Sequence, residues 1–314
     1  MSAPVIGDGP VVLSFDVGGT ATKSALVDAS GRIVDLRRTP TPRSAGDPAG
    51  AIAGHLAGLA ASYRAAHRGL VPVAAGVSVP GLVDEDAGVA VFSGNLGWRD
   101  APIRELAAQA LGMPVAFGHD VRAAGLAEHR WGAAAGHRDA VVVVIGTGIA
   151  SAILIDGTPL VGGGFAGEIG HVVADPEGDP CPCGGVGCLE TVASAGAIAR
   201  RYARAAGAPV DGAREVLHAL RAGDPRAQKV WDEAVEALAR EIVRQITVLA
   251  PGVVVIGGGL AEAGDDLFLP LRGRVAALLT FQRRCEIVRA GLGEDAGLIG
   301  TALRARLLAG ERGA

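Results

Sequence analysis

Short apolar runs alternate with longer helical segments along most of the chain. Four runs rich in Val, Ile and Ala are each followed by a turn containing glycine: 11–15, 73–79, 141–145 and 253–256. Such runs predict buried strands. The segments 48–68, 121–131 and 225–249 are longer and predict helices, and Asp47-Pro48 supplies an N-cap residue with proline in the first turn. The alternation predicts an α/β fold with partly parallel sheets.

Weaker signals complete the predicted elements. Further strands are expected at 23–28, 33–36, 115–117, 149–155 and 286–289, and further helices at 102–112, at 192–206, from about 266 and from about 296. The stretch around Gly94-Asn95-Leu96 is expected to be a loop. Asp84, Glu85 and Asp86 are expected to form a solvated turn.

The first strand pair recurs in the second half of the chain. At an offset of 128 residues, Val17-Gly18 falls on Ile145-Gly146, and Leu26-Val27-Asp28 falls on Leu154-Ile155-Asp156. The offset is the same for both matches, with no insertion or deletion between them, although a match this short also arises by chance. The register favours an internal duplication in which two hairpin turns face each other across a cleft.

Composition narrows the class of protein. The 314 residues are enough for two domains, and 49% hydrophobic with 20% charged residues is typical of a globular protein. The net charge of -4 gives no basic field, so nucleic acid is not an expected partner. The first residues lack a signal-peptide pattern, and no apolar run reaches the roughly 20 residues of a membrane span. We therefore expect a cytoplasmic protein with no membrane partner.

The turn at residues 16–20 has the composition of a phosphate-binding turn. Asp16 ends an apolar strand, Gly18 and Gly19 let backbone N–H groups approach a phosphate, and Thr20 adds a hydroxyl. Asp16 is suited to hold Mg²⁺, which prefers hard oxygen ligands and keeps several waters. An ordinary hairpin turn remains the alternative interpretation.

Two further glycine clusters follow apolar strands. Gly146-Thr147-Gly148 repeats the composition of the first turn, and Gly257-Gly258-Gly259 offers bare backbone on which a nucleotide base or ribose can lie. None of the three clusters fits the P-loop or the dinucleotide fingerprint. We therefore expect two opposed turns, and not one loop at a helix end, to hold the phosphates.

One histidine and three cysteines form a metal-binding pattern. His171, Cys181, Cys183 and Cys188 give the spacing H-x9-C-x-C-x4-C, which suits a closed tetrahedral Cys3His zinc site. A disulfide between two of the cysteines, or free thiols, are the alternatives. A closed zinc site does no chemistry itself, so its expected task is to fix the loop between Glu168 and Glu190. Cys285 is expected to be a small core residue.

These motifs together resemble the ROK family, a group of bacterial sugar kinases and sugar-responsive repressors. The matching pieces run in the family's order over nearly the whole chain: DVGGT at 16–20, VPGLVD at 79–84, GNLGW at 94–98, His119-Asp120, IGTGI at 145–149, GEIGH at 167–171, CPCGGVGCLE at 181–190 and VVIGGGL at 254–260. The combination of GEIGH with CPCGGVGCLE is the most specific part of the resemblance.

The resemblance implies a fold and a role for each matching residue. The fold is the duplicated actin/hexokinase-type (ribonuclease H-like) α/β fold, with two domains around an interdomain cleft. The implied domains are a small one at 1–118 and a large one at 119–297 that carries the zinc loop, with a terminal helix at 298–314 packing back on the first. Asp120 corresponds to the general base. The implied sugar-binding residues are Asn95, His119, Asp120, Glu168, His171 and Glu190. The implied ATP-binding residues are Asp16, Gly18, Gly19, Thr20, Lys23, Gly146, Thr147, Gly148, Gly257 and Gly258.

The sequence departs from the family pattern beside the base. Many family kinases have Glu-Asn-Asp-Ala-Asn, whereas this chain has Gly118-His119-Asp120-Val121-Arg122. The asparagine before the aspartate normally hydrogen-bonds the sugar, and histidine has a different reach and a titratable ring. The base is retained, so the departure bears on which sugar is bound.

The resemblance implies an ATP- and Mg²⁺-dependent kinase of a hexose-type sugar, with glucose as the default substrate and a structural zinc. N-acetylmannosamine, N-acetylglucosamine and fructose are the nearest alternative substrates, and polyphosphate is an alternative donor. A sugar-sensing repressor would carry a DNA-binding domain ahead of residue 16, where only about ten residues precede the first strand. A sugar-binding protein without catalysis is a further alternative. The resemblance also implies a homodimer or tetramer.

Overall fold

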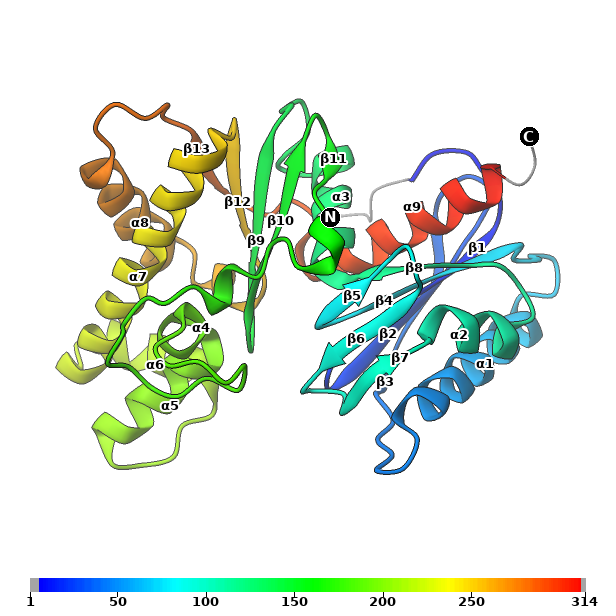
Figure 1. Ribbon diagram of the computed structural model, residues 1–314, viewed down its shortest axis with the longest axis horizontal. Coiled ribbons are helices and arrows are strands. Elements are labelled where there is room, and N and C mark those ends of the chain that lie inside the picture. The colour runs from blue at the N-terminus through cyan, green and yellow to red at the C-terminus, as the bar shows by residue number, and fades with distance from the viewer. Residues whose placement is uncertain (1–5, 312–314) are drawn as a thin grey trace. The chain divides into compact units, whose positions relative to one another are not determined.

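The computed structural model describes residues 6–311, which form two compact units (Figure 1). The first unit contains the chain up to Trp131, the segment Val161–Ala166 and the C-terminal segment from Asp295. The second unit contains Gly132–Leu160 and Gly167–Glu294. Each unit is built on its own five-stranded mixed sheet.

The sheet of the first unit has the strand order β3-β2-β1-β4-β8. β1 pairs antiparallel with β2, and β2 with β3, whereas β1, β4 and β8 run parallel. The strands are β1 (Val12–Val17), β2 (Ala21–Val27), β3 (Ile33–Pro40), β4 (Ala74–Val79) and β8 (Val115–His119). The parallel strands β1 and β8 end at Val17 and His119, so the residues that follow them lie at one edge of the sheet.

Helices cover both faces of this sheet. α1 (Pro48–Ala66) and α2 (Ile103–Leu111) share a buried apolar cluster with Leu13, Phe15 and Val17. On the other face lies α9 (Ala296–Glu311), which contacts β1, β4 and β8 and packs on α3 (Asp120–Trp131). The sequence expectation began the second domain at residue 119, whereas this packing assigns α3 to the first unit.

Helix α9 approaches its neighbours closely because two glycines make room. A Cβ atom on Gly76 of β4 would lie 2.2 Å from the carbonyl oxygen of Thr301, and one on Gly300 would lie 1.8 Å from that of Ala123. The buried hydroxyl of Ser14 donates a hydrogen bond of 2.7 Å to the carbonyl of Leu298. The C-terminal helix is therefore an integral layer of the first unit.

A second, three-stranded sheet in the first unit carries Asn95. It consists of β5 (Leu82–Asp84), β6 (Val89–Ser93) and β7 (Trp98–Ala101), in the order β5-β6-β7. The loop expected around Gly94-Asn95-Leu96 is the turn between β6 and β7, but the three strands were not predicted, because strands of three to five residues give too few alternations to stand out. Asn95 lies in the connection between β6 and β7.

The sheet of the second unit repeats that of the first. Its order is β11-β10-β9-β12-β13, again with two antiparallel pairs followed by two parallel pairs. The strands are β9 (Ala140–Ile145), β10 (Ile149–Ile155), β11 (Thr158–Pro159), β12 (Val253–Gly257) and β13 (Glu286–Arg289). β9 and β10 begin and end 128 residues after β1 and β2, which is the offset found in the sequence.

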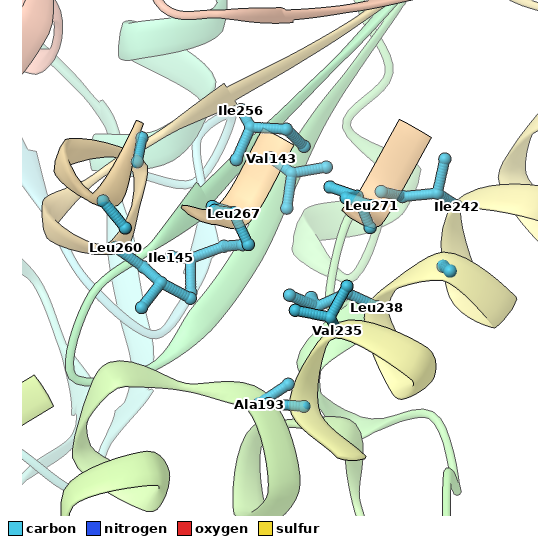
Figure 2. Packing of buried hydrophobic residues seen from close by; sticks show 14 of the residues in the cluster. Val143, Ile145, Ala193, Val235, Leu238, Ile242, Ile256, Leu260, Leu267 and Leu271 are labelled. Carbon is cyan, nitrogen blue, oxygen red and sulfur yellow. The ribbon is translucent and has the colours of Figure 1, made fainter. Parts of the chain in front are cut away.

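The core of the second unit lies between this sheet and two helices (Figure 2). Val143, Ile145 and Ile256 of the sheet pack toward Leu267 and Leu271 of α8 and toward Val235, Leu238 and Ile242 of α7. The helices are α4 (Leu189–Ala193), α5 (Ala195–Ala206), α6 (Gly212–Arg221), α7 (Pro225–Leu249) and α8 (Asp265–Leu278). The helix expected at 192–206 divides at Ser194, whose hydroxyl caps α5 by accepting from the N–H of Ala197.

Short 3-10 turns complete the structure: η1 (Gly162–Gly164), η2 (Ile169–His171), η3 (Gly259–Ala263) and η4 (Gly293–Asp295). No helix within residues 6–311 is both long and apolar enough to cross a membrane.

Candidate active site

Asp16 lies near the end of β1, where the sheet places it beside a hydroxyl. Its partner in the parallel pair with β4 is Ser78, and the Ser78 hydroxyl donates a hydrogen bond of 3.0 Å to Asp16 Oδ1. Thr301 of α9 lies behind it, with its hydroxyl 2.8 Å from Ser78 Oγ. A Cβ atom on Gly297 would come within 2.9 Å of Asp16 Oδ2, so the start of α9 leaves this carboxylate room.

In the turn after Asp16, the backbone carbonyl groups accept hydrogen bonds from Thr41 and Arg43. Thr41 Oγ1 donates to the carbonyl of Gly18 at 2.7 Å, and the N–H of Thr41 donates to the carbonyl of Thr20 at 3.0 Å. Arg43 donates to the carbonyl of Gly19 at 2.6 Å. Because the C=O and N–H of a peptide point in opposite directions, these contacts direct the N–H groups that follow away from Thr41 and Arg43. The turn is therefore preorganised to present N–H groups, as a phosphate site requires.

Asp120 is the first residue of α3 and directly follows β8. Its Oδ1 accepts a hydrogen bond of 2.7 Å from the N–H of Val121, and its side chain keeps 27% of its surface exposed. Burial raises the pKa of Asp120 to about 6 against the lowering effect of that N–H and of Arg122. A carboxyl group with this pKa is ionised at neutral pH and is a stronger base than an ordinary aspartate.

The carboxylates of Asp16 and Asp120 lie close enough to influence each other. Burial, followed by the negative charge of Asp120, raises the pKa of Asp16 to about 6, while the Ser78 hydroxyl and Lys23 oppose the rise. Lys23 on β2 lies opposite Asp16 in the strand register, and its Nζ is 3.6 Å from Asp295 Oδ1. The Asp16 carboxylate and the neighbouring Ser78 hydroxyl offer hard oxygen donors, which fit Mg²⁺.

His119 is buried beneath the base. Its side chain is 5% exposed, and its Nδ1 lies 3.1 Å from the N–H of Val121 and 3.3 Å from Asp120 Oδ1. Burial, together with the positive charge of Arg122, lowers the pKa of His119 to about 3. The imidazole is therefore neutral at physiological pH, and the titration that the sequence analysis raised as a difference from asparagine does not occur there.

Asn95 lies against the first glycine turn. A Cβ atom on Gly19 would be 3.3 Å from Asn95 Cβ, and the side chain of Asn95 is exposed. Arg43 joins the two segments, because it donates to the carbonyl of Asn95 at 3.1 Å and to that of Gly19. Sequence reasoning did not identify Arg43, since an isolated arginine in a loop carries no pattern.

Glu85 corrects the expectation of a solvated turn at 84–86. Its side chain is only 11% exposed and is paired with Arg122 and Arg304. Burial acts to raise the pKa of Glu85, but the two guanidinium groups outweigh it and lower that pKa to about 2. Arg122 is only 1% exposed. Arginine is rarely buried this fully without a partner, and Glu85 is that partner here. The Glu85–Arg304 pair joins positions 219 residues apart, which no local pattern reveals.

In the second unit, Glu190 holds the turn at residues 146–148. Its Oε2 accepts a hydrogen bond of 2.9 Å from the N–H of Ile149, and a Cβ atom on Gly148 would lie 2.4 Å from that oxygen. The N–H of Ala195, at the start of α5, donates to the carbonyl of Gly146 at 2.9 Å. Glycine at 148 is therefore required for the close approach of Glu190.

The third glycine cluster lies beside this second turn. Gly258 has a φ of +80°, and a Cβ atom on it would lie 2.4 Å from the carbonyl oxygen of Ile145, the last residue of β9. Gly257 ends β12, which pairs with β9. The predicted nucleotide-binding segments at 146–148 and 257–259 thus meet at the carboxyl ends of the neighbouring strands β9 and β12.

The segment 167–171 runs along β10. The N–H of Ser151 donates to the carbonyl of Gly167 at 2.8 Å, and a Cβ atom on Gly170 would lie 2.2 Å from the carbonyl oxygen of Ile149. Glu168 and His171 project from this segment, with His171 Nε2 4.0 Å from Glu168 Oε2. The two glycines let the backbone approach the strand and so fix both side chains.

His171, Cys181, Cys183 and Cys188 converge on one point. Their ligand atoms all lie within 4.8 Å of one another, with 3.6 Å between Cys181 Sγ and His171 Nδ1 and 3.6 Å between Cys183 Sγ and Cys188 Sγ. A tetrahedral zinc ion with Zn–S bonds near 2.3 Å separates its ligands by about 3.8 Å. The sulfur separation is far longer than a disulfide bond, and all three cysteines are free thiols. The donor set and its spacing therefore fit zinc.

A bound metal ion would change the protonation of the cysteine thiols. Burial, followed by the neighbouring sulfurs of Cys183 and Cys181, raises the pKa of Cys188 to about 12. Zinc binds the thiolate, so a bound ion would reverse this preference for the protonated form. A tight backbone turn brings the sulfurs together: a Cβ atom on Gly187 would lie 1.4 Å from the carbonyl oxygen of Asp175.

The predicted site residues thus fall into two groups. The first unit brings together Asp16, Gly18, Gly19, Thr20, Lys23, Asn95, His119 and Asp120. The second unit brings together Gly146, Thr147, Gly148, Glu190, Gly257 and Gly258, and carries Glu168 next to the cluster of His171, Cys181, Cys183 and Cys188.

Known proteins of similar sequence cover almost the whole chain. A glucokinase of Thermotoga maritima is 34% identical over 311 residues, covering 93% of this chain and 96% of that protein. An N-acetylmannosamine kinase of Escherichia fergusonii is 33% identical over 299 residues, covering 94% and 98%.

Solved structures agree with these relatives. A ROK hexokinase from Thermus thermophilus has a TM-score of 0.83 at 34% identity, covering 96% of this chain and 99% of that one. A ROK glucokinase from Streptomyces griseus, solved with glucose and AMPPNP, has a TM-score of 0.80 at 29% identity, covering 95% and 99%. These neighbours have the actin/hexokinase-type fold, which confirms the expected fold class. The ROK family model matches residues 12–307, and this chain therefore belongs to the ROK family.

Proposed function

We propose that this protein transfers the γ-phosphate of ATP to a hydroxyl group of a hexose-type sugar, with glucose as its first substrate. The relatives of similar length are sugar kinases, and one structural neighbour was solved with glucose and AMPPNP. The observation that carries the mechanism is the position of Asp120. This carboxylate, with a pKa of about 6, follows β8 directly and lies within electrostatic reach of Asp16, which precedes the first glycine turn.

The reaction requires one proton acceptor. Asp120 accepts the proton of the sugar hydroxyl as that oxygen attacks the γ-phosphorus of ATP. A new P–O bond to the sugar forms, the bond from the γ-phosphorus to the bridging oxygen breaks, and ADP leaves with the bond's electron pair. The proton held by Asp120 is then released to solvent. The ionised carboxylate present at neutral pH is the form that this step needs.

The remaining site residues are proposed to bind and orient the two substrates. Five side chains are proposed to contact the sugar: Asn95, His119, Glu168, His171 and Glu190. The turns at 16–20 and 146–148 are proposed to hold the phosphates, and Gly257 and Gly258 the nucleoside. In phosphoryl transfer such positioning supplies most of the rate enhancement.

Two metal ions are proposed to assist. Asp16 would hold Mg²⁺, through water, where the ion would neutralise the charge of the transferring phosphoryl group. His171, Cys181, Cys183 and Cys188 would hold a structural zinc, which would fix the segments bearing Glu168 and Glu190. Neither proposal changes the role of Asp120 as proton acceptor.

A coupled assay of ADP release with a panel of sugars tests the activity. We expect turnover with glucose that depends on ATP, and a fall in kcat of about 10²–10⁴-fold in Asp120→Asn, the range typical of a lost general base. Asn keeps the size of the side chain, so binding of glucose measured by calorimetry should persist. Unchanged turnover in Asp120→Asn would refute the mechanism, and glucose binding with no turnover in the unaltered protein would favour a sugar-binding protein without catalysis.

N-acetylmannosamine is the second candidate substrate. A kinase of this sugar is 33% identical to the chain, nearly as similar as the glucokinase. His119, in place of the family's usual asparagine, is also a specific difference where the sugar is proposed to bind. Comparing kcat/KM for N-acetylmannosamine with that for glucose in the same assay separates the two candidates.

A further inference from the structure

The strand that leads to Asp120 lies at the edge of its sheet, and two side chains satisfy its outer backbone groups. β8 pairs with β4 and ends the strand order of the first sheet. The N–H of His119 donates a hydrogen bond of 3.2 Å to Glu85 Oε1, and the carbonyl of Phe117 accepts one of 3.2 Å from Arg304 Nη2. Residues i and i+2 of a strand point these groups to the same side, so Glu85 and Arg304 bond the strand as a neighbouring strand would.

Glu85 is the centre of this arrangement. Its Oε1 also accepts a hydrogen bond of 2.8 Å from Arg122 Nε, and its Oε2 pairs with Arg304. One carboxylate therefore joins the connection after β5, the start of α3 and the helix α9. Because Glu85 is only 11% exposed and Arg122 only 1%, few other polar groups can replace these contacts.

Arg122 extends the contacts to neighbouring backbone. Its Nη2 donates to the carbonyl of Val83 at 3.2 Å, and its Nη1 lies 3.5 Å from the carbonyl of Ala166. Arg122 stands two residues after Asp120 in the first turn of α3. The first turn of this helix is therefore fixed on both sides of Asp120: by the N–H of His119 before it and by the guanidinium of Arg122 after it.

Gly118 makes this arrangement possible. A Cβ atom at this position would lie 2.2 Å from Arg304 Nη1 and 2.6 Å from its Cζ. Any side chain at 118 would displace the guanidinium of Arg304 from Glu85 and from the carbonyl of Phe117. Three departures from the family pattern thus belong together, since Gly118, His119 and Arg122 all take part in one set of contacts with Glu85 and Arg304.

We propose that Glu85, held between Arg122 and Arg304, is a positioning residue that fixes the backbone on either side of Asp120 and so aims its carboxylate at the sugar hydroxyl. The inference rests on the proposed role of Asp120 as base. Glu85 itself is paired with the two arginines and takes no part in the proton transfer. Its loss should therefore reduce turnover more than it reduces binding of the sugar.

The first test substitutes Glu85→Gln, which keeps an oxygen acceptor and removes the charge. We expect kcat for glucose to fall at least about 10-fold, with the KM for glucose changing less than about 3-fold. The matched control is Glu241→Gln, in which the same change removes the carboxylate of a glutamate 3% exposed and paired with Arg244 on α7 of the other unit. This control should keep its kcat per folded molecule.

Three outcomes separate the proposal from its alternatives. If folded Glu85→Gln keeps the kcat of the unaltered protein, or loses activity only in proportion to its folded fraction as Glu241→Gln does, the positioning role is wrong. If Asp120→Asn is as active as the unaltered protein, the proposed base is wrong, whatever Glu85 does. If Asp120→Asn is inactive and Glu85→Gln is slow with an unchanged KM, both proposals hold.

A second test does not alter Glu85 and serves even if Glu85→Gln fails to fold. Gly118→Ala should lower kcat at least about 10-fold because its methyl group displaces Arg304. In an Arg304→Met background, the same alanine should lower kcat less than about 2-fold further, since the displaced group is already gone. Equal effects of Gly118→Ala in the two backgrounds, or no effect of Gly118→Ala alone, would overturn the link between Gly118, Arg304 and the base.

Discussion

The two units share one sheet topology but carry different chemistry at their strand ends. In the first sheet, Asp16 of β1 lies opposite Ser78 of β4, and in the second, Val144 of β9 lies opposite Gly257 of β12. Val144 stands 128 residues after Asp16, at the same place in the repeat. A carboxylate and a hydroxyl in one unit are thus replaced by an apolar side chain and bare backbone in the other.

The hairpin turns of the two units are also held by different hydrogen bonds. In the first unit, the N–H of Gly18 donates to the carbonyl of Ala21, whereas in the second the N–H of Gly146 donates to that of Gly148, one residue earlier in the repeat. The second turn is held by a carboxylate, Glu190, and the first by Thr41 and Arg43. The duplicated strands fix where the turns lie, and the side chains around each turn decide what it offers.

The strand topology of the two units is therefore independent of the side chains at their strand ends. The apolar residues within the strands form the two cores and are alike in both units. Polar groups at the strand ends contribute little to those cores, so Asp16 and Ser78 in one copy of the repeat can be replaced by Val144 and Gly257 in the other.

The second unit should depend on zinc, and the first should not. We expect about one zinc ion per chain by elemental analysis, and Cys188→Ala should lose the ion and lower kcat at least about 100-fold, because the loop before Glu190 loses its cross-link. Cys285→Ser is the matched control, since Cys285 lies outside the cluster. Full zinc content in Cys188→Ala would contradict the proposed ligand set.

Asp16→Asn should separate activity from stability in the first unit. We expect kcat to fall about 100-fold because Mg²⁺ loses the carboxylate proposed to hold it, and this is the size usual for one electrostatic contact at a transition state. Asp16 is mostly ionised at pH 7, but because its pKa is higher in the folded protein than in the unfolded chain, its ionisation lowers the free energy of unfolding. The melting temperature at pH 7, measured by calorimetry, should therefore stay the same or rise. A large fall in melting temperature would show that Asp16 supports the fold.

Turnover should decline in acid because the carboxylates of the first unit must be ionised. With pKa values near 6 for both Asp120 and Asp16, kcat/KM should be constant above about pH 7 and fall at least tenfold per pH unit well below 6. Because the carboxylates of Asp16 and Asp120 interact, the two apparent pKa values of the profile describe the pair and not either residue alone. A profile flat down to pH 4.5, measured on folded protein, would exclude either group as an essential base.

His119→Asn, which restores the common family residue, should have the smallest effect. The imidazole is neutral because its pKa is about 3, so a neutral amide should leave the acid limb of the pH profile in place. The KM for glucose should change about 3- to 10-fold, because the reach of the side chain differs. A shift of the acid limb by a full pH unit would show that His119 carries charge in the working enzyme.

Local sequence patterns predicted most elements of the fold. The helix at 225–249 and the strand at 286–289 were predicted with their observed bounds, and the helix is marked by its length and by Asp224-Pro225 at its start. The hairpin repeat was predicted because its residues stay in register over both strands. The small sheet β5-β6-β7 was not predicted, since its strands are too short and too irregularly buried to show a period.

Local sequence patterns were enough to predict the α/β alternation, the repeat, the glycine turns and the set of one histidine and three cysteines. These features are carried by spacings within a few dozen residues, where periodicity and turn chemistry act directly. The burial of Glu85, its pairing with both Arg122 and Arg304, and the closeness of Arg304 to Gly118 all depend on tertiary packing. These contacts join residues up to 219 positions apart, so their energies depend on how the helices pack and not on neighbouring residues in the chain.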